Sequence, residues 1–241
     1  MTDYVLSSET RAKLMRVSTA SIATQLFKRG LRNQFIQDVT PVSPKDVNMV
    51  GQAFTLRYIP AREDRNPLEV FRNEDHPQRV AVETCPAGHV LVMDGRKDAR
   101  AATAGSILIT RLAVRGCAGV VSDGGFRDAH GIGQLDMPAF CAGASAPTNL
   151  TLHEAIEING PIACGDAAVF PGDVIVGDRD GVMVIPAHLA DEIAEVCSGM
   201  ESFEDFVLEE VLSGTSIIGL YPCTKDENQK KFDAWRVKNG R

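Results

Sequence analysis

The segment Gly105-Ser-Ile-Leu-Ile-Thr-Arg-Leu-Ala-Val-Arg-Gly-Cys-Ala-Gly-Val-Val-Ser-Asp-Gly-Gly-Phe-Arg127-Asp128 is the most informative part of this chain. Apolar residues recur at helical spacing through residues 101–115, which predicts a helix that is stopped by Gly116. Residues 118–122 then predict a short buried strand, because they are almost entirely apolar. The pattern of helix, buried strand and glycine turn indicates an α/β protein.

Polar groups at both ends of this segment indicate a binding site. The start of a helix after Gly105 offers free backbone N–H groups to an anion. After the strand, Gly124 and Gly125 allow positive φ angles and close backbone approach, and Arg127 and Asp128 follow them. An arginine supplies a fixed cation and an aspartate a hard oxygen ligand. Although a helix cap and a surface ion pair are simpler interpretations, the combination predicts a site for a small carboxylate and a divalent metal.

The rest of the chain is predicted to form one compact domain with a docked tail. A helix is expected from Ser18, as its N-cap, to Gly30. Residues 60–66 are expected to be irregular, and residues 71–79 to form a loop or a broken helix. Further strands are expected at residues 50–59, 90–93 and 139–142, a β-rich run at 167–186, a long acidic helix at 188–212, and a terminal helix within 225–241 anchored by Phe232 and Trp235.

The composition excludes several classes of protein. The chain has 241 residues, of which 44% are hydrophobic and 24% are charged, and its net charge is −7. A negative chain of this kind is not expected to bind nucleic acid, which normally requires a basic surface. No apolar run approaches the roughly 20 residues that cross a bilayer, and Met1-Thr-Asp-Tyr does not resemble a signal peptide. We therefore expect a cytoplasmic protein without a membrane partner.

The six cysteines contain no C-x-x-C pair and are expected to be reduced and mostly buried. A disulfide framework and a zinc site are therefore not expected, so any metal would require oxygen ligands. The cysteines are Cys85, Cys117, Cys141, Cys164, Cys197 and Cys223.

Other polar residues have simpler structural interpretations. Asp94 and Asp98 are expected to form caps or turns, and Asp178-Arg-Asp-Gly181 is expected to form a hairpin turn. His130 could transfer protons near neutral pH or could be a polar loop residue, and we favour the loop residue. Pro147-Thr-Asn149 indicates the start of a helix and nothing further.

The chain resembles the RraA-like family, which includes class II pyruvate aldolases that act on 4-hydroxy-4-methyl-2-oxoglutarate. The resemblance extends from Ser18 to about Val196. Three segments carry it: Val90-Leu-Val-Met-Asp-Gly, Gly105 to Asp128 with its Gly-Gly-Phe-Arg-Asp ending, and Pro171-Gly-Asp-Val-Ile-Val-Gly-Asp-Arg-Asp-Gly-Val-Met-Val-Ile-Pro.

This resemblance implies a three-layer β/β/α fold of the swivelling-domain type, with an RraA-like domain at residues 1–212 and a C-terminal extension at 213–241. The extension would dock on that domain or on a neighbouring subunit. The resemblance also implies a homotrimer or homohexamer with its site at the subunit interface. Mg²⁺ or Mn²⁺ would be held through waters and Asp128. Arg127 would bind the substrate, and amides near Gly105, Ser106, Ile107 and Leu108 would hold the carboxylate of a pyruvate-like group.

Three functions remain open from the sequence. The leading hypothesis is a metal-dependent lyase in which Arg127 and Asp128 are catalytic and a C–C bond of a 2-oxo acid breaks through a pyruvate enolate, by retro-aldol cleavage or by decarboxylation of oxaloacetate. A second hypothesis is an enzyme of sugar-acid catabolism that acts on another 2-oxo or hydroxy acid, with the polar loop at 62–79 and the tail lining a different pocket. The third is a non-catalytic, protein-binding regulator, because acids found in active aldolases are replaced here by Thr24, Ser106 and Gly131.

Overall fold

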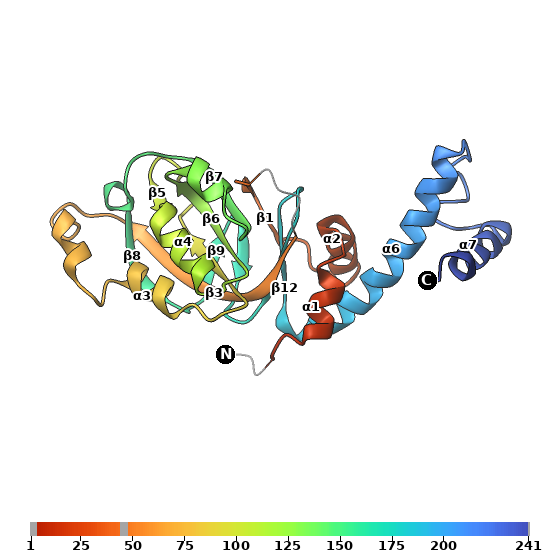
Figure 1. Cartoon of the computed structure of the whole chain (residues 1–241), viewed down its shortest axis with the longest axis horizontal. Coiled ribbons are helices and arrows are strands. Elements are labelled where there is room, and N and C mark those ends of the chain that lie inside the picture. The colour runs from red at the N-terminus through yellow and green to blue at the C-terminus, as the bar shows by residue number, and fades with distance from the viewer. Residues whose placement is uncertain (1–3, 44–47, 241) are drawn as a thin grey trace.

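The computed structural model describes residues 4–43 and 48–240. The expectations for residues 1–3 and for Arg241 therefore lie outside the described ranges. The chain forms a mixed α/β fold with one large curled sheet, helices on either side of it, and a pair of helices at the C-terminus (Figure 1). This confirms the predicted α/β class.

The centre of the large sheet is parallel. Its strand order is β1-β12-β11-β3-β4-β6-β7-β2, and β3, β4, β6 and β7 run parallel to one another. A short strand, β5, pairs with the end of β6, and β8 pairs with the end of β3. The bounds of the parallel strands are β3 Met49–Pro60, β4 His89–Asp94, β5 Ala102–Ala104, β6 Gly119–Phe126 and β7 Ala139–Ala144.

The remaining strands are antiparallel. The hairpin of β11 and β12 joins the edge of β3, and both of its strands are buried on both faces, as their apolar sequences predict. A separate two-stranded sheet, β9 and β10, packs inside the curl. The bounds are β1 Phe35–Ile36, β2 Thr40–Pro41, β8 His153–Ile158, β9 Ile162–Cys164, β10 Ala167–Val169, β11 Val174–Gly177 and β12 Val182–Ile185.

Helices cover the sheet on two sides. One buried cluster joins α3 and α4 to the parallel strands, and another joins α1, α2 and the first part of α6 to the β11–β12 hairpin. The helix α2 begins after Ser18, whose hydroxyl accepts a hydrogen bond from the Ser21 amide, as predicted. The bounds are α1 Ser8–Leu14, α2 Thr19–Lys28, η1 Leu68–Arg72, α3 Pro77–Thr84, α4 Ser106–Val114, α5 Ala129–Gly133, η2 Asn149–Thr151, η3 Ala187–Leu189, α6 Ala190–Leu212 and α7 Asp226–Asn239.

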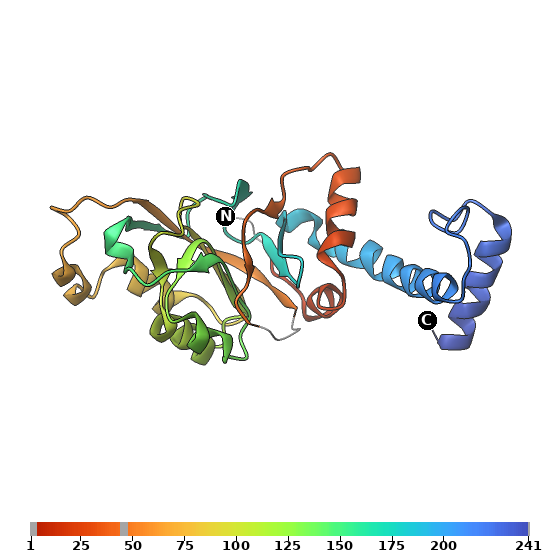
Figure 2. The ribbon, with the colours of Figure 1, turned by 90° about the horizontal axis from the view of Figure 1, so that it is seen from above.

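The C-terminal helices form an arm. The last part of α6 extends away from the sheet, and α7 folds back beside it (Figures 1 and 2). Phe203 and Phe206 of α6 pack against Phe232 and Trp235 of α7, so the predicted aromatic anchor is present. The anchor holds the tail to α6 and not to the sheet.

Two expectations about the central segment are wrong. Residues 102–104 form β5 instead of the start of a helix, because all three are buried and pair with the end of β6. Gly124 and Gly125 lie inside β6 and not after it, and neither has a positive φ angle. A Cβ on Gly124 would lie 2.7 Å from Thr103 Cγ2, so close packing, and not backbone strain, is what requires a glycine there.

Candidate functional site

The short strand β5 is hydrogen-bonded to the other segments that form the candidate site. The amide of Arg127 donates to the Ala104 carbonyl at 3.0 Å, and the amide of Ala102 donates to the Pro147 carbonyl at 2.9 Å. Beneath β5, the Tyr58 hydroxyl and the Gln78 side-chain amide both donate to the Thr103 carbonyl. The site therefore rests on a hydrogen-bonded frame at the carboxyl ends of the parallel strands, where α/β proteins commonly bind ligands.

The start of α4 provides free backbone donors, as the sequence predicts. Gly105 occupies the N-cap position, and no side chain caps the helix. The first amide that makes an intrahelical hydrogen bond is that of Ile109, which donates to the Gly105 carbonyl at 3.2 Å. The amides of Ser106, Ile107 and Leu108 accordingly have no intrahelical acceptor, as is general for the first turn of a helix. Aligned N–H groups of this kind favour an anion such as a carboxylate.

Gly105 also allows the arginine to approach this helix start. A Cβ on Gly105 would lie only 2.7 Å from Cγ of Arg127 and 3.2 Å from Oδ2 of Asp128. Real Cβ atoms essentially never make contacts shorter than 3.0 Å. A larger residue at position 105 would therefore push the Arg127 side chain away from the helix start.

Arg127 and Asp128 lie together at the end of β6 and are about half exposed. The Arg127 Nε lies 3.6 Å from Asp128 Oδ2, and the Ser106 hydroxyl donates to the same oxygen at 3.3 Å. Asp128 has a left-handed backbone with φ of 59° and precedes α5. Both of these contacts use Oδ2, which leaves Oδ1 available to other ligands.

A cavity of about 250 Å³ joins these groups. Among the predicted site residues, Gly105, Ile107, Leu108, Arg127 and Asp128 line it, while Ser106 reaches it through Asp128. The volume suits a small organic acid. The lining residues are Phe71, Gln78, Arg79, Ala102, Ala104, Gly105, Ile107, Leu108, Arg127, Asp128, Thr148 and Asn149.

The cavity offers one carboxylate as a possible ligand for a hard divalent cation. Asp128 is the single carboxylate among the lining residues, and no group of three His, Cys, Asp or Glu side chains that could hold a metal occurs in residues 4–43 and 48–240. Mg²⁺ is commonly bound through one or two carboxylates together with water and substrate oxygens. The residues therefore fit Mg²⁺ or Mn²⁺ held by Asp128 with a chelating substrate, and they do not fit zinc, which prefers nitrogen and sulfur ligands.

The site residues predicted for the lyase leave out about half of the cavity wall. Phe71, Gln78 and Arg79 come from η1 and α3, and the Arg79 guanidinium lies over the Phe71 ring at 5.1 Å from its centroid. Thr148 and Asn149 come from the start of η2. The polar character of residues 71–79 was the one available signal for the first group, and the second group carried only a signal for the start of a helix.

The aspartates with simpler structural interpretations form the predicted turns. Asp94 and Asp98 accept hydrogen bonds from the amides two residues further on, at 3.0 and 3.1 Å, which is an Asx turn. The amide of Asp178 donates to the Gly181 carbonyl at 3.0 Å and closes the β11–β12 hairpin. His130 is exposed and does not line the cavity, but it lies on the short helix α5 and not in the loop that was predicted.

Asp123 is a buried carboxylate that lies outside the cavity. Asp123, within β6, accepts hydrogen bonds from the amides of Gly95 at 2.5 Å and Gly165 at 3.0 Å. Burial, and to a smaller extent the neighbouring Asp94 carboxylate, raises the pKa of Asp123 to about 6. These hydrogen bonds from Asp123 connect the end of β4 to the turn before β10, so the role of Asp123 is structural.

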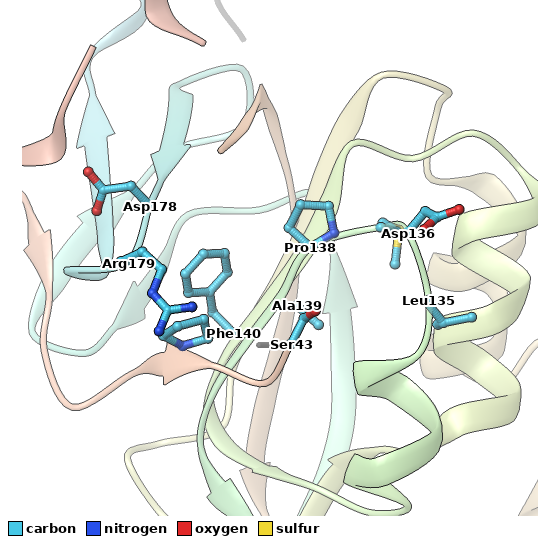
Figure 3. Close-up of a pocket in the computed structure, with 10 residues that line it drawn as sticks. Ser43, Leu135, Asp136, Pro138, Ala139, Phe140, Asp178 and Arg179 are labelled. Atoms are coloured by element: carbon cyan, nitrogen blue, oxygen red, sulfur yellow. The ribbon is translucent and has the colours of Figure 1, made fainter. Parts of the chain in front are cut away.

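A second hollow lies at the opposite end of the sheet. It is lined by Phe140 and its neighbours at the start of β7 and by Arg179 of the β11–β12 turn, which points toward Phe140 in Figure 3. Its volume of about 10 Å³ is about that of one water molecule. The hollow is therefore too small to bind a substrate.

Comparison with known proteins identifies the class. The chain belongs to the RraA-like family, described as Aldolase/RraA, which matches residues 19–184. A protein of Halalkalibacterium halodurans named "Putative 4-hydroxy-4-methyl-2-oxoglutarate aldolase" is 42% identical over 108 residues, which cover 45% of this chain and 51% of that protein. The chain thus spans about half the length of the first curated relatives it matches.

Solved structures share the fold. RraAS2 of Streptomyces coelicolor, described as an unusual member of the RNase ES inhibitor RraA protein family, has a TM-score of 0.73 and 28% identity, with 83% of this chain and 96% of that chain covered. An uncharacterized protein from Pseudomonas syringae has a TM-score of 0.74 and 21% identity over 90% of this chain and 98% of that chain. The predicted RraA fold, a single domain with C-terminal helices, is therefore confirmed.

Two predictions from composition also agree with the structure. All six cysteines are free, and five of them are buried. Within the part of the chain that the structure describes, no helix has both the length and the apolar character needed to cross a bilayer. The cytoplasmic location, the oligomeric state and the absence of a nucleic-acid partner stay predictions.

Proposed function

We propose that this protein is a carbon–carbon lyase that acts on a small 2-oxo acid in the cavity between α4 and the end of β6. One observation carries the proposal: the free amides of α4, the Arg127 guanidinium and the Asp128 carboxylate all border one cavity of about 250 Å³. The aldolase name of the Halalkalibacterium relative supports the same class of reaction.

In the proposed mechanism the chain binds the acid at two points. The amides of Ser106, Ile107 and Leu108 hold the carboxylate at the positive end of α4. Arg127 lies beside the 2-oxo group and stabilises the negative charge that develops on its oxygen as the enolate of pyruvate forms. Asp128 would hold Mg²⁺ or Mn²⁺, and this cation, when bound, supplies Lewis-acid polarisation of the 2-oxo oxygen.

The groups on the cavity wall favour decarboxylation as the first reaction to assay. Retro-aldol cleavage requires a base for the 4-hydroxyl proton, whereas decarboxylation of oxaloacetate releases CO₂ without that proton transfer. Among the residues that the structure describes, Asp128 is the single carboxylate that borders the cavity, and His130 does not border it. Position 131, which holds an acid in active aldolases, is a glycine here, and a Cβ at this position would lie 3.7 Å from Ser106 Cβ, next to the helix start.

The direct test is a steady-state assay with oxaloacetate, with Mg²⁺ and with EDTA. We expect metal-dependent pyruvate formation. Arg127→Ala should lower kcat about 30- to 900-fold, because one charged transition-state donor contributes about 2–4 kcal/mol. Arg111→Ala is the matched control, because Arg111 is also on an exposed surface and pairs with Glu83 outside the cavity. Equal activity of wild type and Arg127→Ala would refute the proposed role.

Two other functions have specific support. The hypothesis of a sugar-derived 2-oxo acid is supported by Phe71, Gln78 and Arg79 of the polar loop, which line a cavity. They share this cavity with Arg127, and the tail of the chain does not line it. A regulatory role is suggested by the description of RraAS2 as belonging to an RNase ES inhibitor family. The regulator requires no metal, so it predicts that Asp128→Asn leaves its activity unchanged, whereas the lyase predicts that this variant loses turnover.

A further inference from the structure

Asn149 is a buried polar residue whose amide nitrogen is not used within the chain. The residue is only 4% exposed and lines the candidate cavity. Its Nδ2 is one of the few buried side-chain nitrogen atoms without a hydrogen-bond partner among the described residues. Folded proteins pair nearly all of their buried polar groups, so each exception calls for an explanation.

The neighbouring buried amide provides a contrast. Gln78 lines the same cavity and is 3% exposed, but its Nε2 donates to the Thr103 carbonyl and so supports β5. The Asn149 Nδ2 makes no comparable hydrogen bond to the described backbone. Because a packing role would be served better by an apolar side chain of similar shape, the amide is retained for something outside the folded chain.

The orientation of Asn149 is fixed by its neighbours. Thr148 donates from its hydroxyl to the Asn149 Oδ1 at 3.2 Å, and the bond from Ala102 to the Pro147 carbonyl holds the segment against β5. The amide oxygen is thus occupied, and Nδ2 is the atom left for a ligand. A donor held in this way is prepared for an acceptor and requires little reorganisation when one binds.

We propose that Asn149 determines specificity by donating a hydrogen bond from Nδ2 to an oxygen atom of the substrate beyond its 2-oxo acid end. This inference rests on the proposed function, since the α4 amides, Arg127 and Asp128 are assigned there to the carboxylate and the 2-oxo oxygen. The substrate class is therefore a 2-oxo acid with a hydroxyl, carbonyl or carboxylate oxygen further along its chain. An acid without that oxygen leaves the buried donor unpaired and binds more weakly.

The test uses three five-carbon acids that a lyase cannot cleave. They are 2-oxopentanoate, which has no further oxygen, 2,4-dioxopentanoate and 5-hydroxy-2-oxopentanoate. Their dissociation constants are measured by isothermal titration calorimetry in Mg²⁺. We expect wild type to bind at least one of the two oxygenated acids about 10- to 100-fold more tightly than 2-oxopentanoate, which is the usual range for a buried hydrogen bond.

One variant and one control separate binding from folding. Asn149→Leu removes the amide at similar volume, and it should abolish the preference while the affinity for 2-oxopentanoate stays within about threefold. Asn149→Leu should also keep its melting temperature, because the buried donor is unpaired. Asn228→Ala is the control: Asn228 is another buried amide, but its Nδ2 donates to the Gly219 carbonyl, so this variant should lose stability and keep the preference.

The outcomes distinguish the two proposals. A preference that survives in Asn149→Leu overturns the inference and leaves the lyase intact. A preference that depends on Asn149, in a protein that cleaves neither oxaloacetate nor hydroxylated 2-oxo acids, supports the inference and refutes the lyase. Wild-type protein that binds the three acids equally, or binds none of them, overturns the inference.

Discussion

Replacing Gly105 by alanine should disable the site while leaving the fold almost unchanged. The φ angle of Gly105 is −123°, which alanine adopts without strain, so the effect comes from the new methyl group alone. That methyl would lie 2.7 Å from Arg127 Cγ and 3.1 Å from its Cδ. These atoms belong to the base and middle of the side chain, so the guanidinium must move as a whole.

The magnitude follows from what the displaced guanidinium contributes. One preorganised charged donor typically contributes about 2–4 kcal/mol to the transition state. We therefore expect Gly105→Ala to lower kcat/KM for oxaloacetate about a hundredfold, close to the loss in Arg127→Ala. Alanine is a poorer N-cap than glycine by less than about 1 kcal/mol, which corresponds to a melting temperature lower by only about 2–4 °C.

A double-mutant cycle tests whether the methyl group acts through the arginine. In an Arg127→Ala background the Cγ and Cδ atoms are absent, so Gly105→Ala should cost less than about threefold more. Gly143→Ala is the matched control, because its Cβ would meet no heavy atom within 4 Å. Additive losses from Gly105→Ala and Arg127→Ala would refute the reasoning, since independent effects add and coupled ones do not.

Three further predictions concern stability and assembly. The pKa of Asp123 rises from 3.8 to about 6 on folding. This group therefore contributes stability that is fully present below about pH 4 and is lost as the pH rises through about 6. Urea unfolding should show this loss of about 3 kcal/mol in wild type and not in Asp123→Asn. Val114, which is 73% exposed on α4, is expected to lie in the subunit interface of a trimer, so light scattering should show Val114→Glu as a smaller species and a wild-type monomer would contradict this. Phe232→Ala removes a buried aromatic contact with Phe206, so limited proteolysis should release α7 while oxaloacetate turnover persists, and an intact α7 would count against the anchor.

Much of the fold was predictable because its signals are local. The N-cap Ser18, the long apolar-rich run of β3 and the Asp-Gly hairpin turn between β11 and β12 each act within a few residues. The strand β5 was not predictable in this way. Its three residues, Ala102–Ala104, are strand only because they pair with β6, and alanine by itself favours a helix. Phe27 shares the apolar spacing of Ile22 and Leu26 in α2, yet it is 56% exposed, and its ring lies against the Arg32 guanidinium at 4.7 Å.

The residues of the candidate site also differ in whether local sequence signals predict them. Gly105, Arg127 and Asp128 could be predicted because a glycine before a helix and an Arg-Asp pair after a strand have chemical meaning in sequence. Asn149 could not, because its importance arises from burial and from a missing partner, which only the packed structure defines. Its segment is held at the cavity by long-range hydrogen bonds, among them those from the Ala102 amide to the Pro147 carbonyl and from the Ala61 amide to the Leu152 carbonyl. Local motifs therefore specify the residues that bind the reacting end of the ligand. The long-range packing of η2 against β5 determines which of many related acids the cavity accepts. The ligand selectivity of Asn149→Leu measures the contribution of this packing separately from that of the local motifs.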